Sequence, residues 1–186
     1  MSRMYLHTAE TAPSESRPFL ERSLANNGFL PNLVATLANS PAATSAYFTL
    51  GEINAKGSLS LAEREIVQIV AATVHGCGFC VAGHTAVALK KAQLSDRIVQ
   101  AARDGEQIKD DRLNAVASLT REIISSRGAV SDSALTAFKQ AGFSDQNALD
   151  VVLGVSLATL CNFANNLAET ELNPQMNSYR WDPKES

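Results

Sequence analysis

The apolar positions of this chain recur with a helical period along most of its length. In the segment 65–75 they stand at i, i+3, i+4, i+7 and i+8, which places them on one face of a helix. No proline, the strongest breaker of helices, occurs between Pro41 and Pro174. Glycines at positions 57, 76, 105, 128 and 142 each stand near the place where a periodic segment stops. The pattern predicts an all-α protein.

The same periodicity, with its caps, predicts the individual helices. Ser60 and Glu63 have the spacing of a capping box, and Ser40 followed by Pro41 is a favourable helix start. Serines or aspartates stand before most of the later helices, where they can act as N-caps. The expected helices cover about 17–27, 30–39, 41–55, 61–75, 78–92, 96–104, 111–126, 132–141 and 145–169.

The polar segment 1–17 has no apolar period, and we expect a flexible N-terminal arm there that docks on a neighbouring subunit. Residues 18–186 are expected to form a single helical bundle, since a chain of 186 residues can bury one sizeable core. We find no internal repeat and no low-complexity segment.

Composition and charge exclude several classes of partner. The net charge of −3 argues against nucleic acid, which usually requires a basic face. We expect no apolar run to reach the length of a membrane span, and the N-terminus lacks the apolar core of a signal peptide. We therefore expect a cytoplasmic protein with no membrane partner. Three cysteines in such a protein do not make a disulfide scaffold, so a close pair indicates redox or metal chemistry.

The candidate site is the spacing Glu65, eleven residues, Cys77, two residues, Cys80, three residues, His84. A helix that begins near residue 77 places Cys80 and His84 one turn apart on one face. Cys77 then lies at the helix start, where free N–H groups and the helix dipole stabilise a thiolate. If the helix of Glu65 packs back against this one, Glu65 can orient His84. The arrangement predicts an activated nucleophile, its base and a residue that orients the base.

This spacing resembles the alkylhydroperoxidase D-like branch of the carboxymuconolactone decarboxylase family. The resemblance extends to the flanking segments GFLPNLVATLANSP and DDRLNAVASLTREIISSRGAVSD, and so covers most of the chain. It implies an all-helical homo-oligomer, a trimer or a hexamer, that reduces hydroperoxides without a metal or an organic cofactor. It also implies that Cys80 attacks the peroxide, that Cys77 resolves the disulfide, and that an external dithiol reduces it. The chain departs from the family at Phe79, where founding members carry a second histidine.

Four other functions fit part of the pattern. A thioredoxin-like enzyme would need a strand before the cysteines and a proline loop facing them, and neither is expected here. Zinc could be bound by Cys77, Cys80, His84 and Glu65, although a second ligand pair is missing. Decarboxylase chemistry, from the family's other branch, does not rely on a cysteine pair. A redox-sensing or purely structural oligomer is the fourth alternative.

The remaining polar residues in apolar surroundings have expected structural roles. Cys161 should behave as a small buried hydrophobe that stays reduced. His75 is expected to cap a helix, and Trp181 to anchor the C-terminal tail. Three asparagines share one face of the last long helix, and we expect them to satisfy a helix–helix contact: Asn162, Asn165 and Asn166.

Overall fold

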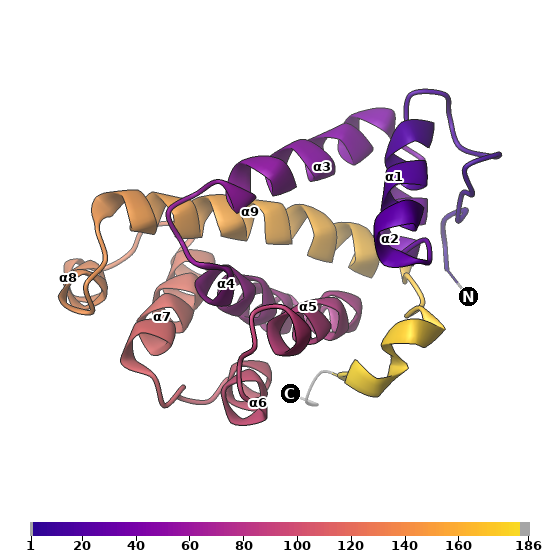
Figure 1. Ribbon diagram of the computed structural model, residues 1–186. Helices are drawn as coiled ribbons and strands as arrows, with labels where there is room; N and C mark the ends of the chain where they lie inside the picture. Colours follow the sequence, from indigo (N-terminus) through magenta and orange to yellow (C-terminus); the bar gives the residue numbers. More distant parts are fainter. Residues whose placement is uncertain (1, 183–186) are drawn as a thin grey trace.

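The computed structural model describes residues 2–182, and the described residues are all-helical, with no strand (Figure 1). The helices are α1 (Arg17–Asn27), α2 (Asn32–Leu37), α3 (Pro41–Ala55), α4 (Leu61–Val74), α5 (Gly78–Lys90), α6 (Asp96–Asp104), α7 (Asp111–Ser126), α8 (Asp132–Gln140), α9 (Asp145–Ala168) and the short 3₁₀ helix η1 (Pro174–Tyr179). The all-α prediction is confirmed, and most predicted helix ends agree within two residues. The helix η1 was not expected.

Helix α4 lies at the centre of the fold and packs against α5, α7 and α9 (Figure 1). Its residues Ile66, Val67, Ile69 and Val70 are completely buried, and burying a side chain of this size contributes about 1.5–3 kcal/mol. The predicted capping box is present, with the Ser60 side chain accepting from the Glu63 N–H and the Glu63 carboxylate accepting from the Ser60 N–H. The packing fixes the orientation of the helix that carries Glu65.

A tight turn joins α4 to α5 and sets α5 against α4. Gly76 has φ of +67°, a left-handed conformation that a residue with a Cβ adopts only at a cost. The Cys77 N–H then donates to the Ala72 carbonyl at 2.8 Å, which closes the end of α4. Cys77 itself is the N-cap of α5. The predicted placement of the cysteine pair at a helix N-terminus is therefore confirmed.

Helix α9 crosses the whole molecule beside α4 and α3 (Figure 1). By length and composition it could cross a membrane, so the expectation that no apolar run is long enough was wrong. One side of α9 is buried against α4, with Val151, Gly154 and Ala158 nearly inaccessible to water. Its other side exposes large apolar side chains, at Leu149, Val152, Phe163 and Leu167. The high hydropathy thus reflects two apolar faces.

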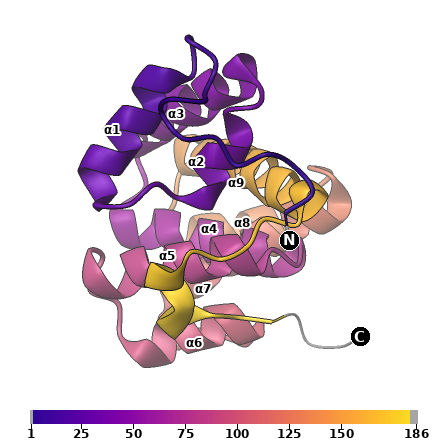
Figure 2. The ribbon, with the colours of Figure 1, turned by 90° about the vertical axis from the view of Figure 1, so that its right-hand side faces the viewer.

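Both chain ends lie against the helical body. In the N-terminal arm, the Arg3 N–H donates to the Ala168 carbonyl at 2.7 Å and the His7 N–H to the Ala35 carbonyl at 3.2 Å. The C-terminal segment runs across α5 towards α6 (Figure 2). Trp181 donates through its indole N–H to the Arg103 carbonyl at 3.1 Å, as expected of an anchor for the tail.

Ser95 stands at the N-cap position of α6, but its side chain makes no capping hydrogen bond. Ser95 thus occupies an N-cap position of the kind predicted but lacks the capping hydrogen bond, and the helix begins where the sequence predicts.

Candidate active site

Glu65 and His84 meet across the α4–α5 contact. Nδ1 of His84 lies 2.8 Å from Oε2 of Glu65, and the Glu65 side chain is only 9% exposed. Burial alone would lower the pKa of His84, but the Glu65 carboxylate and its hydrogen bond outweigh burial and raise this pKa above its ordinary value. With Nδ1 committed to Glu65, Nε2 is the ring nitrogen left for proton transfer.

Cys77 is the more acidic of the paired thiols. Its Sγ accepts a hydrogen bond from the Cys80 N–H at 3.5 Å, as an N-cap oxygen would. The Cys80 thiol also donates to it, which is the largest cause of a Cys77 pKa of about 7. Burial opposes this shift, while Asn165 and the charge of His84 add to it. Cys77 therefore has substantial thiolate character near neutral pH.

Cys80 has the opposite tendency. Its hydrogen bond to Cys77 raises the pKa of Cys80 well above the ordinary value, and burial raises it further. The two sulfurs thus share one proton, which stays on Cys80 while the charge stays on Cys77. This distribution fits the helix start, because the dipole and the N–H groups there favour charge on Cys77.

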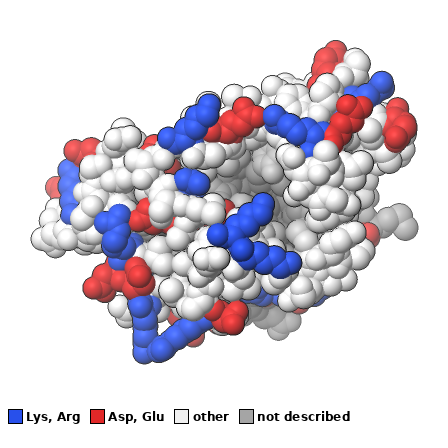
Figure 3. Space-filling view, in the orientation of Figure 1, with Lys and Arg blue, Asp and Glu red and all other residues white. Residues whose placement is uncertain are grey.

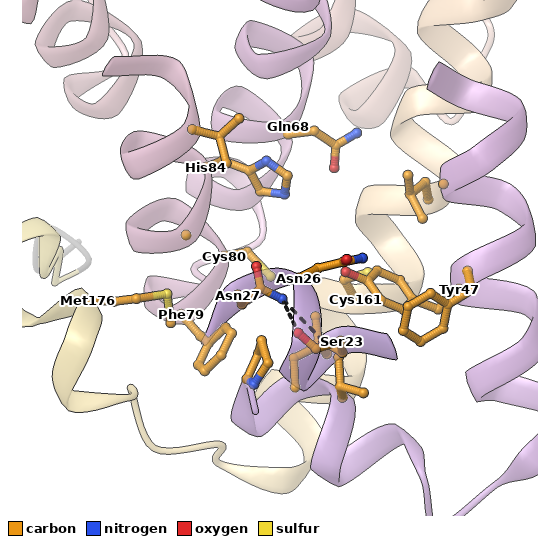
Figure 4. Close-up of a pocket in the computed structure, with 18 of the residues that line it drawn as sticks. Ser23, Asn26, Asn27, Tyr47, Gln68, Phe79, Cys80, His84, Cys161 and Met176 are labelled. Carbon is orange, nitrogen blue, oxygen red and sulfur yellow. Dashed lines mark hydrogen bonds between the residues drawn. The ribbon is translucent and has the colours of Figure 1, made fainter. Parts of the chain in front are cut away.

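An apolar cavity of about 560 Å³ opens beside Cys80, between α5 and the layer formed by α1, α2 and α3 (Figure 3). His84 projects into it, and Cys80 lies in the same wall (Figure 4). Arg22 and Glu52, which form an ion pair at 2.8 Å, stand among the lining residues near the outside. The rest of the lining is largely aromatic and aliphatic, and includes Phe29, Leu33, Val34, Tyr47, Phe48, Phe79, Val87, Leu157 and Met176.

A second, polar cleft of about 820 Å³ opens beside Cys77. Its walls come from the start of α5, the end of α9 and the C-terminal segment, with Asn165, Asn177 and Trp181 among its residues. Cys80 does not line this cleft, and Cys77 does not line the apolar cavity. Phe79 borders both spaces, so the residue between the two sulfurs also stands between the two chambers.

The three asparagines of α9 have separate roles. Oδ1 of Asn162 lies 3.0 Å from Nδ1 of His75, and the side-chain amide of Asn166 donates to the His75 carbonyl at 2.8 Å. Both hold the turn that precedes Cys77, which fits the predicted helix–helix role. Asn165 instead donates to Sγ of Cys80 at 3.2 Å. The sequence favoured a structural role for Asn165, and the structure places it at the site.

Tyr47 is a site residue that the sequence did not reveal. It lies on α3, lines the apolar cavity beside Cys80 and Cys161, and points its hydroxyl into the cavity (Figure 4). Burial, and then the nearby charges of Cys161, Cys80 and Glu65, raise the pKa of Tyr47, so it remains a neutral donor. An isolated tyrosine in an amphipathic helix gives no pattern that would have identified it.

Cys161 is buried in the cavity wall as a free thiol. Burial, followed by the charge of Cys77, raises the pKa of Cys161 to about 12, so it is unreactive as a nucleophile at neutral pH. Within residues 2–182, no three His, Cys, Asp or Glu side chains converge as metal ligands. The geometry therefore does not favour the zinc alternative.

Part of the chain matches a known protein family. Residues 41–122, which include α3 to α7 in large part and all four candidate residues, match the carboxymuconolactone decarboxylase family. No curated protein matches the sequence significantly.

Solved structures show the same fold. A protein from Ralstonia eutropha JMP134, described as an alkylhydroperoxidase AhpD core and an uncharacterized peroxidase-related protein, superposes with a TM-score of 0.85 at 21% identity, over 98% of each chain. A peroxidase-related protein from Silicibacter sp. TM1040 gives 0.80 at 16% identity, over 94% of this chain and 93% of that chain. The debrominase Bmp8 gives 0.78 at 14% identity, over 95% of each chain. Residues 41–122 therefore carry the sequence pattern of the carboxymuconolactone decarboxylase family, and the chain as a whole has the fold of these peroxidase-related structures.

Proposed function

We propose that the protein is a thiol-dependent peroxidase that reduces organic hydroperoxides through Cys80 and Cys77. One observation carries this proposal: Cys80 and His84 line the same apolar cavity, Glu65 holds His84 from behind, and the acidic thiol of Cys77 lies next to Cys80. A nucleophilic sulfur, a proton donor and a second sulfur are the groups that peroxide reduction by a dithiol requires.

In the first step, Cys80 attacks the terminal oxygen of the hydroperoxide. Its proton passes to Cys77, which already accepts a hydrogen bond from the Cys80 thiol. The O–O bond breaks, and the departing alkoxide takes a proton from His84, whose pKa the Glu65 carboxylate raises. The products are an alcohol and the sulfenic acid of Cys80. A buried hydrogen-bond donor such as Tyr47 can stabilise the charge that develops on the leaving oxygen.

In the second step, the Cys77 sulfur attacks the sulfenic sulfur of Cys80. The S–O bond breaks, hydroxide leaves and combines with the Cys77 proton as water, and a disulfide forms. The net reaction consumes two thiols and one hydroperoxide and yields one disulfide, one alcohol and one water. A dithiol must then return two electrons to the protein, and this external reductant remains an expected partner.

The apolar lining of the cavity favours organic hydroperoxides over hydrogen peroxide. Four aromatic side chains line the cavity, from Phe29, Tyr47, Phe48 and Phe79. Burying an apolar substituent against them stabilises the complex by roughly 25 cal/mol per Å² of apolar surface removed from water. A hydroperoxide with an aryl or alkyl group gains this term, whereas hydrogen peroxide does not.

Thiol counting with one equivalent of cumene hydroperoxide tests the proposal. We expect two of the three thiols to disappear, and peptide mapping to locate a Cys77–Cys80 disulfide with Cys161 still reduced. We expect this result because Cys77 and Cys80 are already joined by a hydrogen bond, whereas the raised pKa of Cys161 keeps that thiol unreactive. Three intact thiols, or Cys161 in the main disulfide, would contradict the proposed function.

A further inference from the structure

We propose that the polar cleft beside Cys77 is the binding site for the reducing dithiol, so that hydroperoxide and reductant approach the cysteine pair from opposite sides. This inference rests on the proposed function, because it concerns the disulfide that peroxide reduction leaves behind. It starts from the observation that each sulfur lines a different chamber.

The C-terminal segment separates the two chambers. Met176, on η1, lines the apolar cavity, whereas the next residue, Asn177, lines the cleft. Arg103 holds this segment in place, with its guanidinium donating to the Tyr179 carbonyl at 3.2 Å and to the Arg180 carbonyl at 2.8 Å. The indole of Trp181 donates in return to the Arg103 carbonyl. The cleft is thus a built feature with a fixed outer wall.

The start of α5 is shaped to accept that wall. A Cβ at Gly78 would lie 2.7 Å from the Trp181 carbonyl oxygen, so only glycine allows the segment to approach so closely. Trp181 therefore lies directly against the residue that follows Cys77. This contact places Cys77 at the bottom of the cleft, next to the polar side chains of the segment and of α9.

Asn165 provides an independent sign of a ligand. Asn165 is 3% exposed and lines the cleft, and its Nδ2 donates a hydrogen bond to Sγ of Cys80. Its Oδ1 has no hydrogen-bond partner among the described residues, and an orphaned buried carbonyl oxygen is costly. A bound thiol or hydroxyl group in the cleft would supply the missing donor.

A dithiol in the cleft can reduce the Cys77–Cys80 disulfide in two thiol–disulfide exchange steps. A thiolate of the reductant attacks Sγ of Cys77, the S–S bond breaks, and Cys80 leaves with the Asn165 amide donating to its sulfur. The second thiol of the same molecule then attacks the mixed disulfide and releases Cys77, whose pKa of about 7 makes it a good leaving group. The reductant ends as a cyclic disulfide, and the two electrons end on Cys77 and Cys80.

The cleft carries side chains of both charges. Its lining includes Glu169, Glu171, Asp182 and Arg180, and Glu169 forms an ion pair with Arg3 of the N-terminal arm. An uncharged dithiol can enter such a site without a counter-charge of its own. Dithiothreitol is a suitable probe.

The test measures the two half-reactions separately in two variants. Asn177→Trp fills the cleft from an exposed position in its lining. We expect it to slow reduction of the disulfide by dithiothreitol roughly tenfold or more, because exchange depends on access to the attacked sulfur, and to leave oxidation by cumene hydroperoxide unchanged. Gly83→Leu narrows the apolar cavity. It should slow oxidation by cumene hydroperoxide and leave reduction of the disulfide by dithiothreitol unchanged.

Ser178→Trp is the matched control, since Ser178 is exposed and neighbours Asn177 but lines neither chamber. It should behave as the parent protein in both half-reactions. Reduction of Asn177→Trp at the parental rate, or an equal loss in both half-reactions, would overturn the proposed reductant site. Diamide, a general thiol oxidant, can form the disulfide if peroxide does not, so the reductant site can be tested even where the peroxidase proposal fails.

Discussion

The two chambers beside the cysteine pair differ in nearly every physical property. The cavity that Cys80 lines is apolar and enclosed by α1, α2, α3 and α5, whereas the cleft that Cys77 lines is polar and bounded by the chain's C-terminal segment. Residues three apart in a helix normally share a face. Cys77 departs from this rule because it is the N-cap, with φ of −95° and ψ of 90°, so its side chain need not follow the face of Cys80. One non-helical residue thus gives each sulfur its own surroundings.

The same comparison explains why chemically identical thiols differ in acidity. Cys77 receives hydrogen bonds at a helix start and has a pKa of about 7, while Cys161, in an apolar wall, has a pKa of about 12. The hydrogen bond to Cys77, burial and the charges of both other cysteines raise the pKa of Cys80, which carries the proton that it shares with Cys77. Acidity alone would identify Cys77 as the nucleophile, whereas access to the apolar cavity identifies Cys80. The predictions below are chosen to separate these two criteria.

The largest expected effect comes from removing either sulfur of the pair. Cys80→Ser should abolish consumption of cumene hydroperoxide, because Cys161, the other cysteine in the cavity wall, has a pKa of about 12. Cys77→Ser should consume one equivalent and then stop, because the sulfenic acid has no partner thiol. Steady-state consumption with excess dithiothreitol, followed through loss of peroxide, distinguishes complete inactivity from a single turnover. Full turnover by Cys77→Ser would contradict the resolving role.

A smaller loss is expected from the proton relay. His84→Gln should slow oxidation by about 10²-fold, since positioned acid–base groups typically contribute ~10²–10⁴-fold. Glu65→Gln should cost less, because the amide can still hold Nδ1 although it no longer stabilises the charged imidazole. Stopped-flow oxidation rates measure both. His7→Gln, in the N-terminal arm, is the control and should match the parent protein; an equal loss there would show that the effect is not specific to the site.

Narrowing the apolar cavity should slow oxidation by a large organic hydroperoxide more than oxidation by hydrogen peroxide. Gly83→Leu adds a side chain in the wall beside His84, where an added Cβ meets only Sδ of Met176, at 3.8 Å. We expect a roughly tenfold loss with cumene hydroperoxide, the size of effect that pocket-filling groups usually have. Oxidation by hydrogen peroxide should change little. Equal losses with both peroxides would mean that the cavity does not hold the organic group.

The smallest effects concern the acidity of Cys77. Its alkylation by iodoacetamide should rise with pH through a midpoint of about 7, because the depressed pKa forms the reactive thiolate above that value and loses it below. Cys80→Ala should move this midpoint upward, since the thiol hydrogen bond is the largest cause of the shift. His84→Gln should also move it upward, but by less. A midpoint that stays near the ordinary thiol value in the parent protein would contradict the assignment of the resting charge.

Much of this arrangement could be predicted from the sequence because it depends on local patterns. Helix periodicity, the capping box of Ser60 and the spacing of Cys77 to His84 are all encoded within a few turns. The contact of Glu65 with His84 also followed, because a short turn forces two consecutive helices to pack together. The helix start also indicated a stabilised thiolate at Cys77. The hydrogen bond from the Cys80 thiol, which is the largest cause of the low Cys77 pKa, did not follow from the spacing.

Contacts between distant segments were the part that could not be predicted. Asn165 reaches Cys80 across 85 positions of sequence, and its pattern in α9 equally suits a structural contact. Tyr47 reaches the cavity only through the packing of the α1–α3 layer over α5. The C-terminal wall of the cleft depends on Arg103 binding to backbone carbonyls, which carry no sequence signal.

The location of the first oxidised sulfur tests most directly whether access or acidity selects the nucleophile. In Cys77→Ser the loss of the neighbouring thiolate removes the largest cause that raises the pKa of Cys80, so Cys80 stays reactive. Treating this variant with one equivalent of cumene hydroperoxide and dimedone should give a single adduct on Cys80 by peptide mass spectrometry. An adduct on Cys77 in Cys80→Ser, together with an inert Cys77→Ser, would contradict the role of the apolar cavity and make Cys77 the attacking sulfur.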